Sequence, residues 1–130
     1  MGDFIAYLDT SEVRDGKLED LKHAMAELAE FVELNEPRII SYHVYFSADG
    51  ANMSVLHLHP DVASLEFHLK VAGPKFPPIA PFIKMQTIEI FGHPTEELVA
   101  ELQAKANLLG GSVIVRHLHA GFARLAGQAG

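Results

Sequence analysis

Two His-x-His pairs are the groups of this chain best suited to chemistry. One pair, His57 and His59, lies in VLHLHPD, and a near copy, VRHLHAG, carries His117 and His119. On a β-strand, side chains two positions apart share a face and lie about 6.6 Å apart along the chain. Each pair would therefore present two imidazoles on one side of a strand. Such groups can bind a transition metal, act as bases in a cavity, or belong to ordinary half-exposed strands.

Length and composition limit the kind of protein that carries these groups. With 130 residues, 48% of them hydrophobic, the chain fits one domain, residues 1–130, that can bury its own core. A formal charge of -7 disfavours nucleic acid and anionic membranes as partners. Cysteine is absent, which excludes disulfides and thiolate chemistry. No signal-like start and no 18-residue apolar run are present, so we expect a cytoplasmic protein.

The elements that position the histidines begin with a strand and a helix. Residues 4–8, FIAYL, predict a strand buried on both sides. A helix should follow and stop before Pro37. Its apolar stripe consists of Leu18, Leu21, Met25, Leu28 and Val32.

A β-hairpin comes next, with its turn at Asp49-Gly50 between two β-rich runs. A two-residue turn places Tyr42 opposite His57. The shared face would then also carry Val44, Phe46, Met53 and Val55. A bulge would instead present Ser41, His43 and Tyr45 on that face.

A short helix capped by Asp61 follows the hairpin, and His68 lies at the border of its inner stripe of Leu65, Leu69 and Ala72. The segment GPKFPPIAPF is too rich in proline for regular structure and reads as a loop that could cover a pocket. Residues 84–91 predict a fourth strand. Residues 1–92 therefore read βαββαβ, the ferredoxin-like arrangement of an α+β protein.

Residues 93–130 form an extension to this unit. Thr95 should cap a helix whose apolar stripe is Leu98, Leu102, Ala106 and Leu109. SVIVRHLH, residues 112–119, predicts a fifth strand, and the small residues from 120 onward predict a loosely held tail.

The order and spacing of residues 36–76 resemble the antibiotic biosynthesis monooxygenase-like family of the dimeric α/β-barrel superfamily. The resemblance covers residues 2–91. The matching positions are Glu36-Pro37, Tyr42, Asp61, the run from Ser64 to His68, and Phe76. Three positions depart from the family pattern: His57 replaces a Glu, His59 a Trp, and Lys75 a frequent His.

The resemblance implies a homodimer in which two sheets pair into an α/β barrel, with a cavity in each subunit between the sheet and the short helix. The extension would then extend or brace the dimer. Family members include cofactor-free oxygenases of phenols and quinols, haem-degrading oxygenases, and proteins without an established substrate. The chain has no Trp, which disfavours haem degradation.

The first functional hypothesis is a cofactor-independent monooxygenase in which a cavity imidazole deprotonates a phenolic or quinol-like aromatic substrate and the anion reduces dioxygen. Because imidazole titrates near pH 6.5 and phenol near 10, the site must favour the phenolate by about 5 kcal/mol. His68 is the preferred base, since the family position faces the cavity. His57 or Tyr42 would orient the substrate and His59 would line the mouth. Phe67, Phe76 and Phe82 would supply walls.

Two other hypotheses stay open. A metal site on the His-x-His strands would need strands three and five to converge. A dimeric protein that binds a small apolar ligand without turnover would need only the apolar cavity walls. Whether the protein is an enzyme at all is decided by the geometry of the site, and not by the fold.

Overall fold

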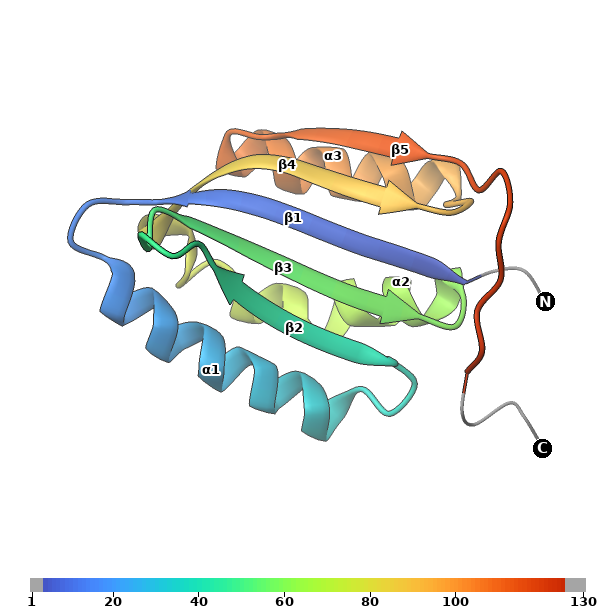
Figure 1. Cartoon of the computed structure of the whole chain (residues 1–130), viewed down its shortest axis with the longest axis horizontal. Helices are drawn as coiled ribbons and strands as arrows, with labels where there is room; N and C mark the ends of the chain where they lie inside the picture. Colours follow the sequence, from blue (N-terminus) through green and yellow to red (C-terminus); the bar gives the residue numbers. More distant parts are fainter. Residues whose placement is uncertain (1–3, 126–130) are drawn as a thin grey trace.

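Five strands form one sheet in the order β2-β3-β1-β4-β5 in the computed structural model, which describes residues 4–125 (Figure 1). The elements are β1 Ile5–Val13, α1 Leu18–Asn35, β2 Ser41–Phe46, β3 Asn52–His59, α2 Val62–Ala72, β4 Ile83–Phe91, α3 Glu96–Leu109 and β5 Ser112–Arg116. Two short 3-10 turns, Gly73–Lys75 and Ala80–Phe82, lie in the proline-rich segment. The first six main elements follow the predicted βαββαβ order, so the ferredoxin-like prediction is confirmed.

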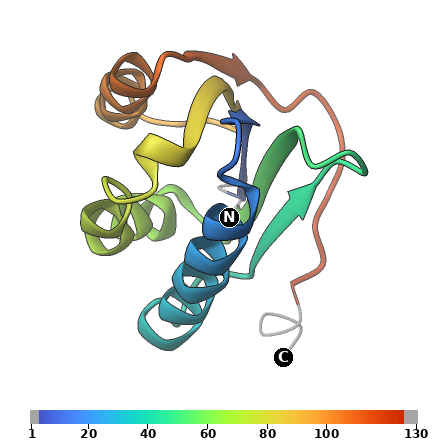
Figure 2. The ribbon, with the colours of Figure 1, turned by 90° about the vertical axis from the view of Figure 1, so that its left-hand side faces the viewer.

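The helices α1, α2 and α3 lie together on one face of this sheet (Figure 2). The extension adds to both layers, because β5 pairs parallel to β4 at the sheet edge while α3 packs on β4 and β5 in the helix layer. The opposite face of the sheet meets none of the three helices. No helix between residues 4 and 125 is long and apolar enough to cross a membrane.

The hairpin has the register that a two-residue Asp-Gly turn predicts. Tyr42 lies opposite His57 and Phe46 opposite Met53, with no slip along the pair. The turn is closed by the Asp49 carboxylate, which accepts hydrogen bonds from the Ser47 hydroxyl and a backbone N–H. Gly50 has a φ of 73°, a conformation that suits glycine. This register directs the Tyr42 and His57 side chains to the helix-covered face.

The prediction of a first strand buried on both sides was wrong for the single chain. The strand is longer, and burial alternates along it from Ile5 to Ser11. Tyr7 and Asp9 are buried beneath the helices, whereas Ala6 and Leu8 are half-buried on the opposite face. Alternate residues of this apolar run therefore point to the two faces of the sheet, and only one of these faces is covered by the helices.

The helices bury the stripes that their spacing predicts. In α1 the buried residues are Leu21, Met25, Leu28 and Val32. In α3 they are Leu98, Leu102, Ala106 and Leu109, and the Thr95 hydroxyl caps the helix by accepting from the Leu98 N–H at 3.1 Å. The α1 stripe packs in one buried apolar cluster with residues of β3 and β4, and the α3 stripe packs in a second cluster with residues of β1 and β4.

The fifth strand is shorter than predicted and ends at Arg116. His117 and His119 therefore lie in the exposed irregular segment that follows, and not on a strand. The predicted loose tail is irregular and largely exposed as far as residue 125. Its last part, residues 126–130, lies outside the described residues.

Candidate functional site

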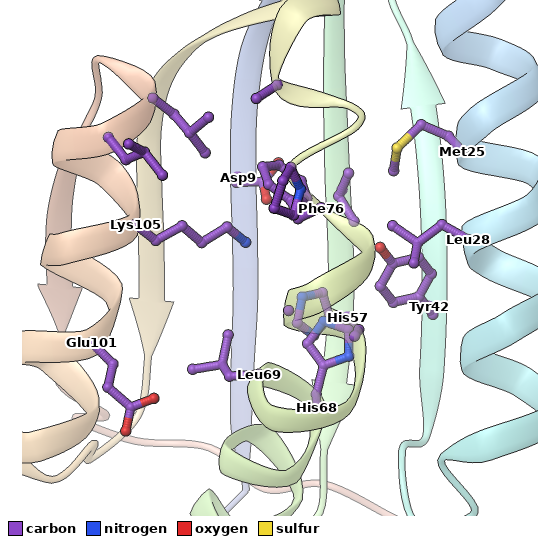
Figure 3. A pocket seen from close by; sticks show the side chains of 17 residues that line it. Asp9, Met25, Leu28, Tyr42, His57, His68, Leu69, Phe76, Glu101 and Lys105 are labelled. Atoms are coloured by element: carbon purple, nitrogen blue, oxygen red, sulfur yellow. The ribbon is translucent and has the colours of Figure 1, made fainter.

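A pocket with a volume of about 250 Å³ lies between the sheet and the helices (Figure 3). Its walls come from all three helices, from strands β1, β2 and β3, and from the proline-rich segment. The apolar lining includes Met25, Leu28, Val55, Leu69, Phe76, Leu108 and Leu109. The polar lining consists of Asp9, Tyr42, His57, His68, Glu101 and Lys105. An apolar pocket with a few convergent polar groups is typical of a small-molecule site.

His68 points from α2 into this pocket and is paired with a buried carboxylate. Asp61 starts the helix at the right place, because its side chain accepts from the Ser64 N–H at 2.9 Å. The Nδ1 atom of His68 lies 2.9 Å from both carboxylate oxygens of Glu36, whose side chain is only 2% exposed. In the neutral form of His68, with the Nδ1 proton donated to Glu36, Nε2 keeps its lone pair. Within residues 4–125, Nε2 has no hydrogen-bond partner and is not fully buried, so it can meet a ligand.

His57 lies against His68 and is held by a second chain of hydrogen bonds. Its Nδ1 is 2.7 Å from Nε2 of His59, and Nδ1 of His59 is 2.8 Å from the Ser64 hydroxyl. The His57 ring stacks on Tyr7 at 4.1 Å between ring centres and lies 4.5 Å from the His68 ring. The structure thus gathers the predicted His57 and His68 on one wall.

Burial sets the charge of these groups. It lowers the pKa of His57 well below its usual value and lowers the pKa of His59 to about 3, with the neighbouring His68 ring adding to both effects. Both imidazoles are therefore neutral at pH 7. Tyr42, whose ring centre lies 5.2 Å from that of His57, also has a pKa raised by burial, so it stays a hydroxyl donor. His57 and Tyr42 therefore form an uncharged part of the wall beside His68.

A further polar chain, which sequence reasoning missed, spans β1 and the extension helix. The Tyr7 hydroxyl donates to Oδ2 of Asp9 at 2.8 Å, and Nζ of Lys105 donates to the Tyr7 oxygen at 2.9 Å. Burial raises the pKa of Asp9, although Lys105 and Tyr7 oppose the shift, and burial lowers the pKa of Lys105. Alternation along β1 could have revealed Asp9, because it shares the buried face with Ile5 and Tyr7. The sequence contains little indication that Lys105 faces the pocket, because this residue lies beside the apolar stripe of α3 and not within it.

Some predicted site residues lie elsewhere. His59 is fully buried and bonded to His57 and Ser64, so it does not line the mouth. Phe67 is 45% exposed on the outer side of α2. Phe82 packs against the core cluster under α1 and does not line the pocket. Phe76 does line the pocket, which confirms that the proline-rich segment covers part of it.

The two His-x-His pairs do not meet. The strands β1 and β4 lie between β3 and β5, and His117 and His119 lie beyond β5 in any case. Within residues 4–125, no group of three or more His, Asp or Glu side chains is arranged to hold a metal ion. The convergence of strands three and five that the alternative metal hypothesis requires is therefore not met in the part of the chain that the structure describes.

Solved structures share this architecture. MupZ from Pseudomonas fluorescens superposes with a TM-score of 0.74 at 17% identity, over 97% of this chain and 93% of that chain. A candidate antibiotic biosynthesis monooxygenase from Caulobacter crescentus gives a TM-score of 0.62 at 21% identity, over 68% of this chain and 88% of that chain. SnoaB, a cofactor-independent oxygenase from Streptomyces nogalater, gives 0.60 at 14% identity, over 72% of this chain and 95% of that chain.

The chain has the antibiotic biosynthesis monooxygenase-like fold. This confirms the resemblance read from residues 36–76 at the level of the fold. No protein-family model and no curated protein sequence matches the chain. The superposition with MupZ covers 97% of this chain and must include most of α3 and β5, so this fold with its extension occurs in another protein.

Proposed function

We propose that the protein is a cofactor-independent monooxygenase acting on a small phenolic or quinol-like substrate. The observation that carries the proposal is the buried pair of His68 and Glu36 on the wall of an apolar pocket. A neutral imidazole whose other nitrogen is held by a carboxylate is suited to general-base catalysis. The shared fold with SnoaB supports the same reaction class.

In this proposal His68 takes the phenolic proton at Nε2, and Glu36 stabilises the imidazolium that forms. The resulting phenolate reduces dioxygen at a ring carbon that carries hydrogen. Overall the phenol loses two hydrogens, gains one oxygen as a quinone carbonyl, and the second oxygen atom leaves as water. Dioxygen alone supplies the oxidising equivalents, so no external reductant is needed. His57 and the Tyr42 hydroxyl would orient the substrate, while Phe76, Leu28 and Met25 exclude water.

We also propose that the working form is a homodimer, and the uncovered face of the sheet supports this. Leu8, Leu56 and Leu58 are half-buried on the sheet face that meets none of the three helices. A second copy placed on this face, as in the dimer that the family resemblance implies, would bury these side chains. The pocket itself lies on the opposite, helix-covered face. Pairing would therefore stiffen the floor of the pocket without forming its walls.

Oxygen uptake with a panel of hydroquinones and naphthols tests the proposed reaction. We expect Glu36→Gln to lower kcat by about 100-fold or more, because a side-chain amide can force the His68 tautomer that lacks a lone pair at Nε2. The matched control is Glu33→Gln, an exposed change one helical turn away that should leave the rate unchanged. Equal rates for Glu36→Gln and wild type would remove His68 as the base.

The second candidate is a ligand-binding protein without turnover. Both ring nitrogens of His59 are hydrogen-bonded, one to His57 and the other to Ser64, so fewer polar groups are left to act on a substrate. This observation favours the second candidate. In the same panel, a compound that raises the melting temperature without any oxygen uptake would establish binding and exclude the oxygenase for that compound.

A further inference from the structure

Lys105, Tyr7 and Asp9 form a second hydrogen-bonded polar group at the pocket, here called the Lys105 cluster, in which Lys105 and Asp9 line the pocket. It is separate from the pair of His68 and Glu36, because it joins β1 to α3 and shares no hydrogen bond with that pair among residues 4–125. Figure 3 shows the Lys105 side chain reaching from α3 into the pocket, with its amine turned toward the side of Asp9 and Phe76. The cluster thus faces the same space as the base.

Some donor and acceptor atoms of the cluster have no hydrogen-bond partner among residues 4–125. Lys105 has three N–H donors when charged, and only the one to Tyr7 has a partner in residues 4–125. Asp9 accepts from Tyr7 at Oδ2, while Oδ1 has no partner in the same residues and is not fully buried. Both Asp9 and Lys105 line the pocket. Donors and an acceptor are therefore available there to a ligand.

The surroundings make these contacts strong. Nζ of Lys105 lies 4.4 Å from the ring centre of Phe76 and 5.3 Å from that of Tyr7, so aromatic faces and not water surround much of the ammonium group. Asp9 is only 3% exposed. Charge-assisted hydrogen bonds in such a site are worth more than in water and suit an oxygen atom that gains negative charge.

We propose that the Lys105 cluster holds the oxygen atom of a carbonyl or enolate group, so that the pocket catalyses enolisation of small cyclic ketones without dioxygen. The inference rests on the proposed function for its base, His68. It adds a group contributed by the extension helix and a substrate functional group, a ketone with an acidic α-hydrogen.

The step balances without any redox partner. The bond between the α-carbon and its hydrogen breaks, and the proton passes to Nε2 of His68. The electron pair forms the carbon–carbon double bond of the enol, while the carbonyl π pair moves to oxygen. That oxygen takes a proton from the Lys105 cluster, which delivers it through Nζ or through the Asp9 carboxyl. In the reverse direction the α-carbon regains a proton from His68, which in D2O is a deuteron.

The experiment measures exchange of the α-hydrogens of 2-tetralone and 1-indanone by proton NMR in D2O under argon. We expect the wild-type protein to exchange at least one ketone faster than buffer does. Lys105→Met should lower the protein-catalysed rate by about 100-fold, the effect of losing one oxyanion donor. The control Lys70→Met, an exposed change on α2 outside the pocket, should stay within about twofold.

Thermal unfolding of each variant checks that the fold is intact, and Lys105→Gln serves as the second variant if Lys105→Met does not fold. The inference is overturned if neither ketone exchanges faster with the protein than in buffer, or if folded Lys105 variants exchange at the wild-type rate. Exchange under argon that depends on Lys105, combined with no oxygen uptake for any phenol, would refute the oxygenase and leave this inference standing. Oxygen uptake without exchange would do the reverse.

Discussion

Mild acid should destabilise the fold through the buried His57 and His59. Each has a folded-state pKa below its ordinary value of 6.5, with burial as the main cause. In the unfolded chain these two imidazoles therefore bind protons near pH 6.5, whereas in the folded chain they bind protons only at a lower pH. Stability contributed by these rings in their neutral form is complete above pH 7 and is lost as pH falls.

The magnitude follows from the pKa of His59, which falls from 6.5 to about 3. Each pH unit between these values costs about 1.4 kcal/mol, so His59 alone removes roughly 5 kcal/mol between pH 7 and pH 3. His57 acts in the same direction. Asp9 acts against them, because a carboxyl whose pKa is raised in the folded state favours folding as pH falls. Typical domains are stable by about 5 to 15 kcal/mol, so the histidine effect is large.

Urea unfolding followed by circular dichroism at fixed protein concentration, from pH 7.5 to pH 4, measures this slope. A comparison of wild type with His59→Gln isolates one ring, since Asp9 is present in both. The variant should lose about 1.4 kcal/mol per pH unit of the dependence between pH 6 and pH 4. The exposed His23→Gln is the control and should keep the wild-type slope. Identical slopes for His59→Gln and wild type would refute the burial argument.

Two further predictions test the packing and the assembly. Gly111→Ala should lower the free energy of unfolding by about 1 to 3 kcal/mol, because its Cβ would lie 2.8 Å from Cγ of Met85 and 3.2 Å from the Gln86 carbonyl; Gly73→Ala, with nothing within 4 Å, should cost nothing measurable by the same urea titration. Leu56→Glu should convert the proposed homodimer to monomer in light scattering, whereas Leu34→Glu, at a side chain 76% exposed on α1, should not. A wild-type monomer at micromolar concentration would reject the homodimer.

Patterns with local causes were predictable from the sequence. The stripes of α1 and α3, the cap at Asp61 and the Asp49-Gly50 turn depend on residues a few positions apart, and each appears where it was expected. The register of the hairpin followed from its turn, and it fixed the direction of Tyr42 and His57. Local sequence patterns were therefore sufficient to predict one wall of the pocket.

Features that depend on contacts between distant segments were not predictable in the same way. The Lys105 cluster joins residues 98 positions apart, and no spacing rule links β1 to α3. The role of His59 was misjudged because its partner, the Ser64 hydroxyl, turns it inward from the next helix. The end of β5 was placed too late, since alternation continues through His117 and His119 although the pairing with β4 stops at Arg116.

The extension and two of the three departures from the family pattern, His57 and His59, change the polar groups around the pocket. His57 and His59 are neutral and bonded to one another, so the sheet offers imidazoles where the family pattern has a Glu and a Trp. The family pattern's carboxylate on this wall is thereby lost, while Asp9 supplies a carboxyl on the neighbouring strand with a lysine from α3 beside it. Because α3 packs on β4 and β5, Lys105 reaches the Tyr7 hydroxyl that bonds this carboxyl, so under the proposed enolisation the extension would supply a functional group as well as a brace.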